Sequence, residues 1–113
     1  MKEKIEHLLR SGFELKASDI HITVGIPPVM RINGDLRRYG TDNITPDEIE
    51  AMAKAIIPEN SWDVFKSKGE LDFSYGIAGI SRFRVNAYHQ RGCVSLAVRI
   101  VPTRIPTLEE LQL

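Results

Sequence analysis

Two stretches in the last third of this 113-residue chain alternate between bulky apolar and other side chains, and this period of two constrains the fold most. The segment 82–86 reads Arg-Phe-Arg-Val-Asn, and 94–100 has bulky apolar residues at every second position. Such alternation is typical of β-strands with one buried and one exposed face. Gly92 between the two stretches favours a turn. We therefore expect an antiparallel hairpin that packs against a core on one side.

Helical signals mark three other parts of the chain. Thr45 is the expected N-cap of one helix, because Pro46 suits the first helical position and Glu48, at the third, can form a capping box with Thr45. A shorter helix is expected over 60–68, with Trp62 and Phe65 facing inward. The opening segment carries an apolar stripe at helical spacing. The stripe consists of Ile5, Leu8, Leu9, Gly12 and Phe13.

Further strands are predicted before and between these helices. Polar and apolar residues alternate over 19–24 and again over 71–75. The segments 29–32 and 36–39 flank an Asn-Gly-Asp turn at 33–35, a strong hairpin signal because Asn and Gly tolerate positive φ. The order is helix, strands, two helices and three strands. It predicts an α+β domain in which helices flank a mainly antiparallel sheet.

Charge and cysteine content exclude several classes of protein. Fifteen Lys and Arg residues balance fifteen Asp and Glu residues, so the basic surplus of a general nucleic-acid binder is missing. Cys93 is the only cysteine, which excludes an internal disulfide and a cysteine-cluster zinc site. The chain starts with charged residues, and no window reaches the roughly 18 apolar residues of a membrane helix. We expect a cytoplasmic location and no nucleic-acid partner.

No motif for self-sufficient catalysis is present in the sequence. It contains no G-x-x-x-x-G-K-[ST] phosphate loop, no G-x-G-x-x-G, no G-x-S-x-G and no H-E-x-x-H. Asp19 and His21 lie two apart on a predicted strand, so they share a face and could share a metal ion. The alternative, which we favour, is that both are polar groups on a solvated or interface side. We expect no catalytic residue and no metal site in this chain.

Arginines gather on one face of the C-terminal hairpin. Arg82, Arg84 and Asn86 occupy alternate positions and therefore point to the same side of their strand. When the apolar faces of both strands are matched, one allowed register sets Arg82 opposite Arg99 and another sets Arg84 opposite Arg99. Either register brings three arginines together. Because like charges at cross-strand distance repel, the cluster is expected to have an anionic partner.

Two sources of negative charge are open for this cluster. Glu70 and Asp72 lie on the polar face of the preceding strand and could neutralise the arginines. An external phosphate is the other source, because the planar guanidinium suits bidentate contact with phosphate oxygens. Arg91 and Arg104 could extend a phosphate-binding patch of this kind.

Five blocks spread over nearly the whole chain resemble the N-terminal part of the type IV pilus retraction ATPases, the twitching-motility motors of the secretion ATPase superfamily. The blocks are ASDIH at 17–21, PPVMRINGD at 27–35, LDFSY at 71–75, SRFRVN at 81–86 and RIPTLEEL at 104–111. Their order and spacing make the resemblance far more specific than any single block.

The resemblance implies a PAS-like N-terminal domain over 1–101 and, over 102–113, the start of a linker toward a RecA-like ATPase domain that this chain lacks. The phosphate loop and the catalytic glutamate belong to that motor domain, so the fragment itself is not expected to be an enzyme. In the family, ATP and Mg²⁺ lie between the two domains and six subunits form a ring. The implied partners are the motor domains of the same and neighbouring subunits and the pilus machinery at the inner membrane.

The resemblance also implies roles for the arginines. Arg84 and Arg99 match two family arginines that contact the phosphates of the nucleotide, and Arg82 and Arg91 are further candidates. Phosphoryl transfer requires neutralisation of charge that spreads over the γ-phosphate oxygens. Arginines on a separate domain reach that charge only when the domains close, so the domain is expected to move as a rigid unit during hydrolysis.

Ser18, Asp19 and His21 match a family motif to which we assign a structural or interface role. Two alternatives from other classes stay open at this point. The chain could be a stand-alone PAS-like module that senses a small ligand in an apolar pocket. It could also be an interaction domain whose arginines pair with its own acids and only shape an interface.

Overall fold

The computed structural model describes residues 2–90 and 92–101. It contains three α-helices, a short 3₁₀ helix and six strands. In chain order these are α1 (Lys2–Glu14), β1 (Ala17–Ile22), β2 (Val29–Ile32), β3 (Asp35–Arg38), α2 (Pro46–Ile56), η1 (Glu59–Ser61), α3 (Trp62–Lys68), β4 (Glu70–Ile77), β5 (Ser81–Gln90) and β6 (Cys93–Val101).

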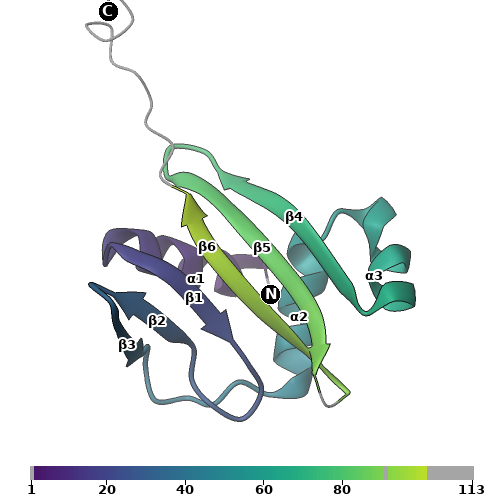
Figure 1. The fold of residues 1–113 in the computed structure, drawn as a ribbon, viewed down its shortest axis with the longest axis horizontal. Helices are drawn as coiled ribbons and strands as arrows, with labels where there is room; N and C mark the ends of the chain where they lie inside the picture. Colours follow the sequence, from purple (N-terminus) through teal and green to yellow (C-terminus); the bar gives the residue numbers. More distant parts are fainter. Residues whose placement is uncertain (1, 91, 102–113) are drawn as a thin grey trace, which may run out of the picture.

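The six strands form one antiparallel sheet with the order β3-β2-β1-β6-β5-β4 (Figure 1). The first strand, β1, lies between its hairpin partner β2 and the last strand, β6. β5 is the other neighbour of β6, and β4 forms the far edge. The predicted α+β architecture with an antiparallel sheet and flanking helices is confirmed.

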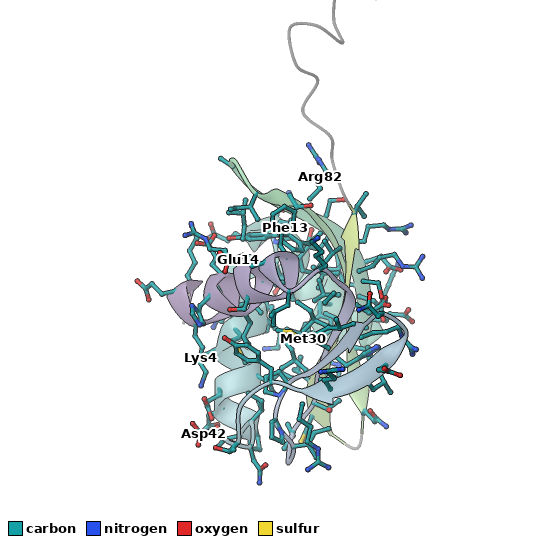
Figure 2. All side chains as sticks on the ribbon, turned by 90° about the vertical axis from the view of Figure 1, so that its left-hand side faces the viewer. Lys4, Phe13, Glu14, Met30, Asp42 and Arg82 are labelled. Carbon is teal, nitrogen blue, oxygen red and sulfur yellow. The ribbon has the colours of Figure 1, made fainter. Side chains whose placement is uncertain are left out.

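Helices α1 and α2 pack on one face of the sheet, and α3 lies beside β4 (Figure 1). Seen edge-on in Figure 2, the sheet has its helices on one side and many side chains ending in nitrogen or oxygen on the other. No helix of the described part of the chain covers this second side, which we call the uncovered face. The core lies between helices and sheet. Its fully buried members include Ile5, Leu9, Ile20, Ile22, Ile49, Met52, Phe83, Val85, Leu96 and Val98.

Two local predictions are confirmed in detail. In the β2–β3 hairpin, Asn33 (φ 52°) and Gly34 (φ 83°) both have the positive φ that the tight turn requires. At the start of α2, the Thr45 side chain accepts a hydrogen bond from the Glu48 amide, and the Glu48 carboxylate accepts one from the Thr45 amide, each at 3.2 Å. This capping box satisfies two amides that a helix start otherwise leaves unpaired.

One prediction is wrong. Phe13 belongs to the apolar stripe expected for α1 but is 37% exposed. At Gly12 the helix packs so closely on β1 that a Cβ would lie 2.5 Å from Ile20 Cδ1, and the next residue is turned about 100° away from the sheet.

The carboxylate of Glu48 at the start of α2 makes the stability of the fold depend on pH. The ion pair from Lys4 holds the pKa of Glu48 below its ordinary value of 4.5, and the hydrogen bonds from the Thr45 backbone and side chain lower it further. A carboxyl whose pKa is lowered by folding stabilises the fold above its unfolded pKa and loses this contribution as pH falls through the folded pKa.

We therefore expect the melting temperature of the wild type to fall more between pH 5 and pH 3 than that of Glu48→Gln, a comparison that thermal melts in matched buffers provide. Glu50→Gln, which removes an exposed carboxylate from the same helix, should follow the wild type. Equal pH dependence in all three proteins would contradict the assignment.

No helix in the described ranges is both long enough and apolar enough to cross a membrane. The segment 102–113 lies outside the described residues, so the linker that was predicted there stays a prediction.

Candidate functional site: an arginine pair on the uncovered face

The hairpin of β5 and β6 places two arginines directly opposite each other. Arg84 pairs with Arg99 in the antiparallel register, which is the second of the two registers that the alternation allowed. Their neighbours Phe83, Val85 and Val98 point into the core, so both guanidinium groups extend from the uncovered face. Side chains at such paired positions are close enough for two positive charges to repel. We call Arg84 and Arg99 the arginine pair.

The other two arginine candidates differ in position. Arg82 lies on the same face at the start of β5, opposite Gly76 and Val101, one strand repeat away from Arg84. Arg82 can add positive charge to the uncovered face, but it does not lie opposite another arginine. Arg91 lies outside the described residues, as does Arg104. Of the four predicted phosphate-binding residues, the sheet therefore brings Arg84 and Arg99 together.

Asp19 links Arg99 to a third arginine. Asp19 of β1 lies opposite Arg99 of β6 on one side and Arg31 of β2 on the other. One carboxylate oxygen lies 3.7 Å from the Nε atom of Arg99, and the other lies 3.7 Å from that of Arg31. The hydroxyl of Ser18 donates a hydrogen bond of 2.8 Å to the same carboxylate. The motif residues Ser18 and Asp19 thus belong to this site, and Arg31 is a member that the sequence analysis missed.

The acids of β4 do not neutralise the arginine pair as one reading of the sequence proposed. The side-chain amide of Asn86 donates hydrogen bonds to Asp72 (3.0 Å) and Glu70 (3.2 Å). The register explains this choice, because Asp72 lies directly opposite Asn86 whereas Arg84 faces Ser74. Over residues 2–90 and 92–101, neither acid forms an ion pair with an arginine.

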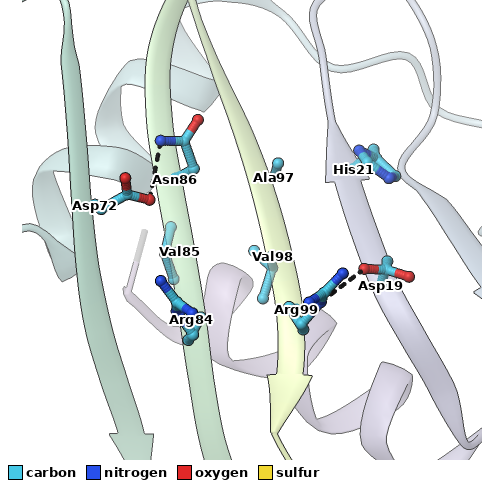
Figure 3. A pocket seen from close by; sticks show the side chains of 9 residues that line it. All are labelled: Asp19, His21, Asp72, Arg84, Val85, Asn86, Ala97, Val98 and Arg99. Carbon is cyan, nitrogen blue, oxygen red and sulfur yellow. Dashed lines mark hydrogen bonds and ion pairs between the residues drawn. The ribbon is translucent and has the colours of Figure 1, made fainter.

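These side chains surround a shallow hollow of about 300 Å³ on the uncovered face (Figure 3). We call it the arginine hollow. Its polar lining consists of Asp19, His21, Asp72, Arg84, Asn86 and Arg99. His21 lies across from Ala97, whose small side chain leaves room between β1 and β5. A concave surface with exposed guanidinium groups is suited to bind an anion with several oxygen atoms.

The lining does not resemble a metal site. No group of three His, Cys, Asp or Glu side chains with suitable positions exists among the residues that the structure describes. Asp19, which the sequence placed beside His21 as a possible ligand, has both carboxylate oxygens near arginines. The interface role predicted for His21 remains a prediction.

Comparison with known proteins shows what this chain is related to. No protein-family model matches the sequence. The type IV pilus ATPase PilU of Pseudomonas aeruginosa is 36% identical over 110 residues, which cover 97% of this chain. The type IV pilus retraction ATPase PilT of the same species is 34% identical over 107 residues, or 95% of the chain. A crystal structure of the pilus retraction motor PilT with bound ADP matches 91% of the chain at 34% identity and a TM-score of 0.80.

This chain is homologous to the N-terminal region of the PilT and PilU type IV pilus ATPases. It spans 29% of the PilU sequence, 31% of the PilT sequence and 30% of the PilT chain in the crystal structure. The Legionella pneumophila ATPase DotB shares the fold, with a TM-score of 0.77 over the whole of this chain at 24% identity. The resemblance that the five sequence blocks indicated is confirmed.

Proposed function

We propose that this chain is the N-terminal domain of an ATP-hydrolysing motor of the type IV pilus retraction kind. Its homology to PilT and PilU over nearly its full length supports this proposal. In the parent protein, residues 102–113 begin the linker to a RecA-like ATPase domain. Six subunits form a ring at the cytoplasmic side of the inner membrane, where the ring acts on the pilus machinery.

The arginine pair gives the domain its role in this motor. Arg84 has no carboxylate within ion-pair distance among the described residues. The Nε atom of Arg99 lies 3.7 Å from Asp19, and the side chain of Arg99 is 72% exposed. The guanidinium groups of both arginines are therefore available for phosphate oxygens, which they bind with short, charge-assisted hydrogen bonds. This availability on the uncovered face is the observation that carries the proposal.

The nucleotide itself would be held by the RecA-like domain, where Mg²⁺ would supply positive charge that stabilises the phosphates. Arg84 and Arg99 approach the phosphate oxygens when the uncovered face closes over the nucleotide, and they stabilise charge that develops there during hydrolysis. Helices α1 and α2 share one core with the sheet. The domain therefore moves as one rigid unit, and its closure couples hydrolysis to motion of the ring.

The reading frame that encodes this chain tests the motor assignment without any biochemistry. Sequencing the gene beyond the codon for Leu113 should reveal a continuous frame with a G-x-x-x-x-G-K-[ST] motif within a few dozen codons. A stop codon directly after Leu113 would contradict the assignment and would favour a free-standing sensor or interaction domain.

A further inference from the structure

The amide of Asn86 occupies Asp72 and Glu70, the two acids of β4 that lie on the same face as the arginine pair. Its Nδ2 atom donates one hydrogen bond to Asp72 and one to Glu70, at 3.0 and 3.2 Å. An amide NH₂ group has two donor hydrogens, so these contacts use its full donor capacity. Figure 3 shows Asp72 turned toward Asn86 along the ladder between β4 and β5.

Asp72 would otherwise be a natural partner for Arg84. Both side chains line the arginine hollow, and they are diagonal neighbours because Asp72 lies opposite Asn86, two residues along β5 from Arg84. Diagonal positions in an antiparallel pair are about 7–8 Å apart, a separation that a long side chain such as arginine spans. Glu70 lies opposite Tyr88, a further strand repeat away from Arg84. Asp72 is therefore the acid most able to compete with a phosphate for Arg84.

We propose that Asn86 is a positioning residue that holds Asp72 away from Arg84 and so keeps this arginine free for the phosphates of the nucleotide. The inference rests on the proposed function. The two arginines then have different surroundings, because Arg99 has Asp19 at 3.7 Å whereas Asn86 keeps Arg84 without an acidic partner. If Asp72 also paired with Arg84, both arginines would be neutralised in part before ATP arrived.

The test uses the complete motor protein and four variants: Arg84→Ala, Asn86→Ala, Asp72→Asn, and Asn86→Ala combined with Asp72→Asn. ATP turnover and the affinity for a fluorescent ATP analogue are measured for each. Asn86→Ala frees Asp72 to pair with Arg84, so kcat/KM should fall by up to about fivefold, the most that one exposed ion pair usually contributes. The double variant removes the competing charge and should return to within about twofold of the wild type.

Restoration of activity in the double variant distinguishes a positioning role of Asn86 from a direct contact with the nucleotide. If Asn86→Ala lowers kcat/KM and the added Asp72→Asn does not restore it, Asn86 contacts the nucleotide or shapes the face, and the positioning role is overturned. An unchanged Asn86→Ala beside an impaired Arg84→Ala also overturns it and leaves the proposed function intact. An unchanged Arg84→Ala overturns the proposed contact of Arg84 with the phosphates, and the positioning role of Asn86 with it.

If Asn86→Ala does not fold, Asp72→Asn alone still tests the proposal. Asp72→Asn alone cannot pair with Arg84 as an anion, so its ATP affinity should equal or exceed that of the wild type. Weaker ATP binding by folded Asp72→Asn would contradict the view that Asp72 competes with phosphate.

Discussion

Arg84→Ala in the complete motor protein should lower ATP turnover by about 100-fold to 1000-fold, the usual cost of losing one preorganised group that stabilises developing negative charge. Arg84 is exposed on the uncovered face and forms no ion pair with another described residue, so little else depends on its side chain. The free energy of unfolding should therefore change by no more than about 0.5 kcal/mol. A large kinetic effect without a stability effect is the expected signature of a group that acts on the nucleotide.

The matched control is Arg10→Ala. Arg10 is an exposed arginine of α1, on the helical side of the sheet, so its replacement removes the same charge from the opposite side of the domain. Its turnover should stay within about twofold of the wild type. Steady-state turnover at saturating ATP, together with urea unfolding, checks both variants. Equal turnover in Arg84→Ala and the wild type would remove Arg84 from the mechanism.

Phe83→Ala, one residue earlier in the chain, should have the opposite profile. Phe83 points to the helix-covered face, has no exposed surface and belongs to the main core. Replacing a buried phenylalanine by alanine costs about 3–5 kcal/mol through lost burial and the cavity that remains. Since small domains are stable by only about 5–15 kcal/mol, this loss is a large share of the total.

The measurement for Phe83→Ala is urea unfolding of the 113-residue chain, followed by the fluorescence of its single tryptophan, Trp62. Leu36→Ala is the control, because Leu36 is 59% exposed and its loss should cost no more than about 0.5 kcal/mol. A cost below about 1 kcal/mol for Phe83→Ala would contradict the assignment of the two faces of β5.

The alternation in the sequence predicted which face each residue of β5 and β6 occupies, but it could not choose between the two allowed registers. Both registers match apolar residues with apolar residues, so hydrophobic pattern alone does not separate them. The turn selects the register, because Gln90 pairs with Cys93 and this pairing sets Arg84 opposite Arg99. The turn and cap signals at Asn33 and Thr45 were reliable because they act through neighbouring atoms.

The parts of the site that sequence reasoning missed depend on contacts between distant segments. Arg31 joins Asp19 and Arg99 only because β1 lies between β2 and β6, which brings one of the first strands against the last. No local pattern encodes that neighbourhood. Asp72 lies on the expected face, but it pairs with Asn86 and not with an arginine, because the register places it opposite Asn86.

The structure of the complete protein bound to a non-hydrolysable ATP analogue is the measurement that tests the central claim most directly. We predict that, in at least one subunit of the ring, guanidinium nitrogens of Arg84 and Arg99 lie about 2.7–3.2 Å from phosphate oxygens. The uncovered face of the sheet would then form one wall of the nucleotide site. Phosphates bound in every subunit with both guanidinium groups more than about 6 Å away, beyond direct charge-assisted contact, would contradict the claim.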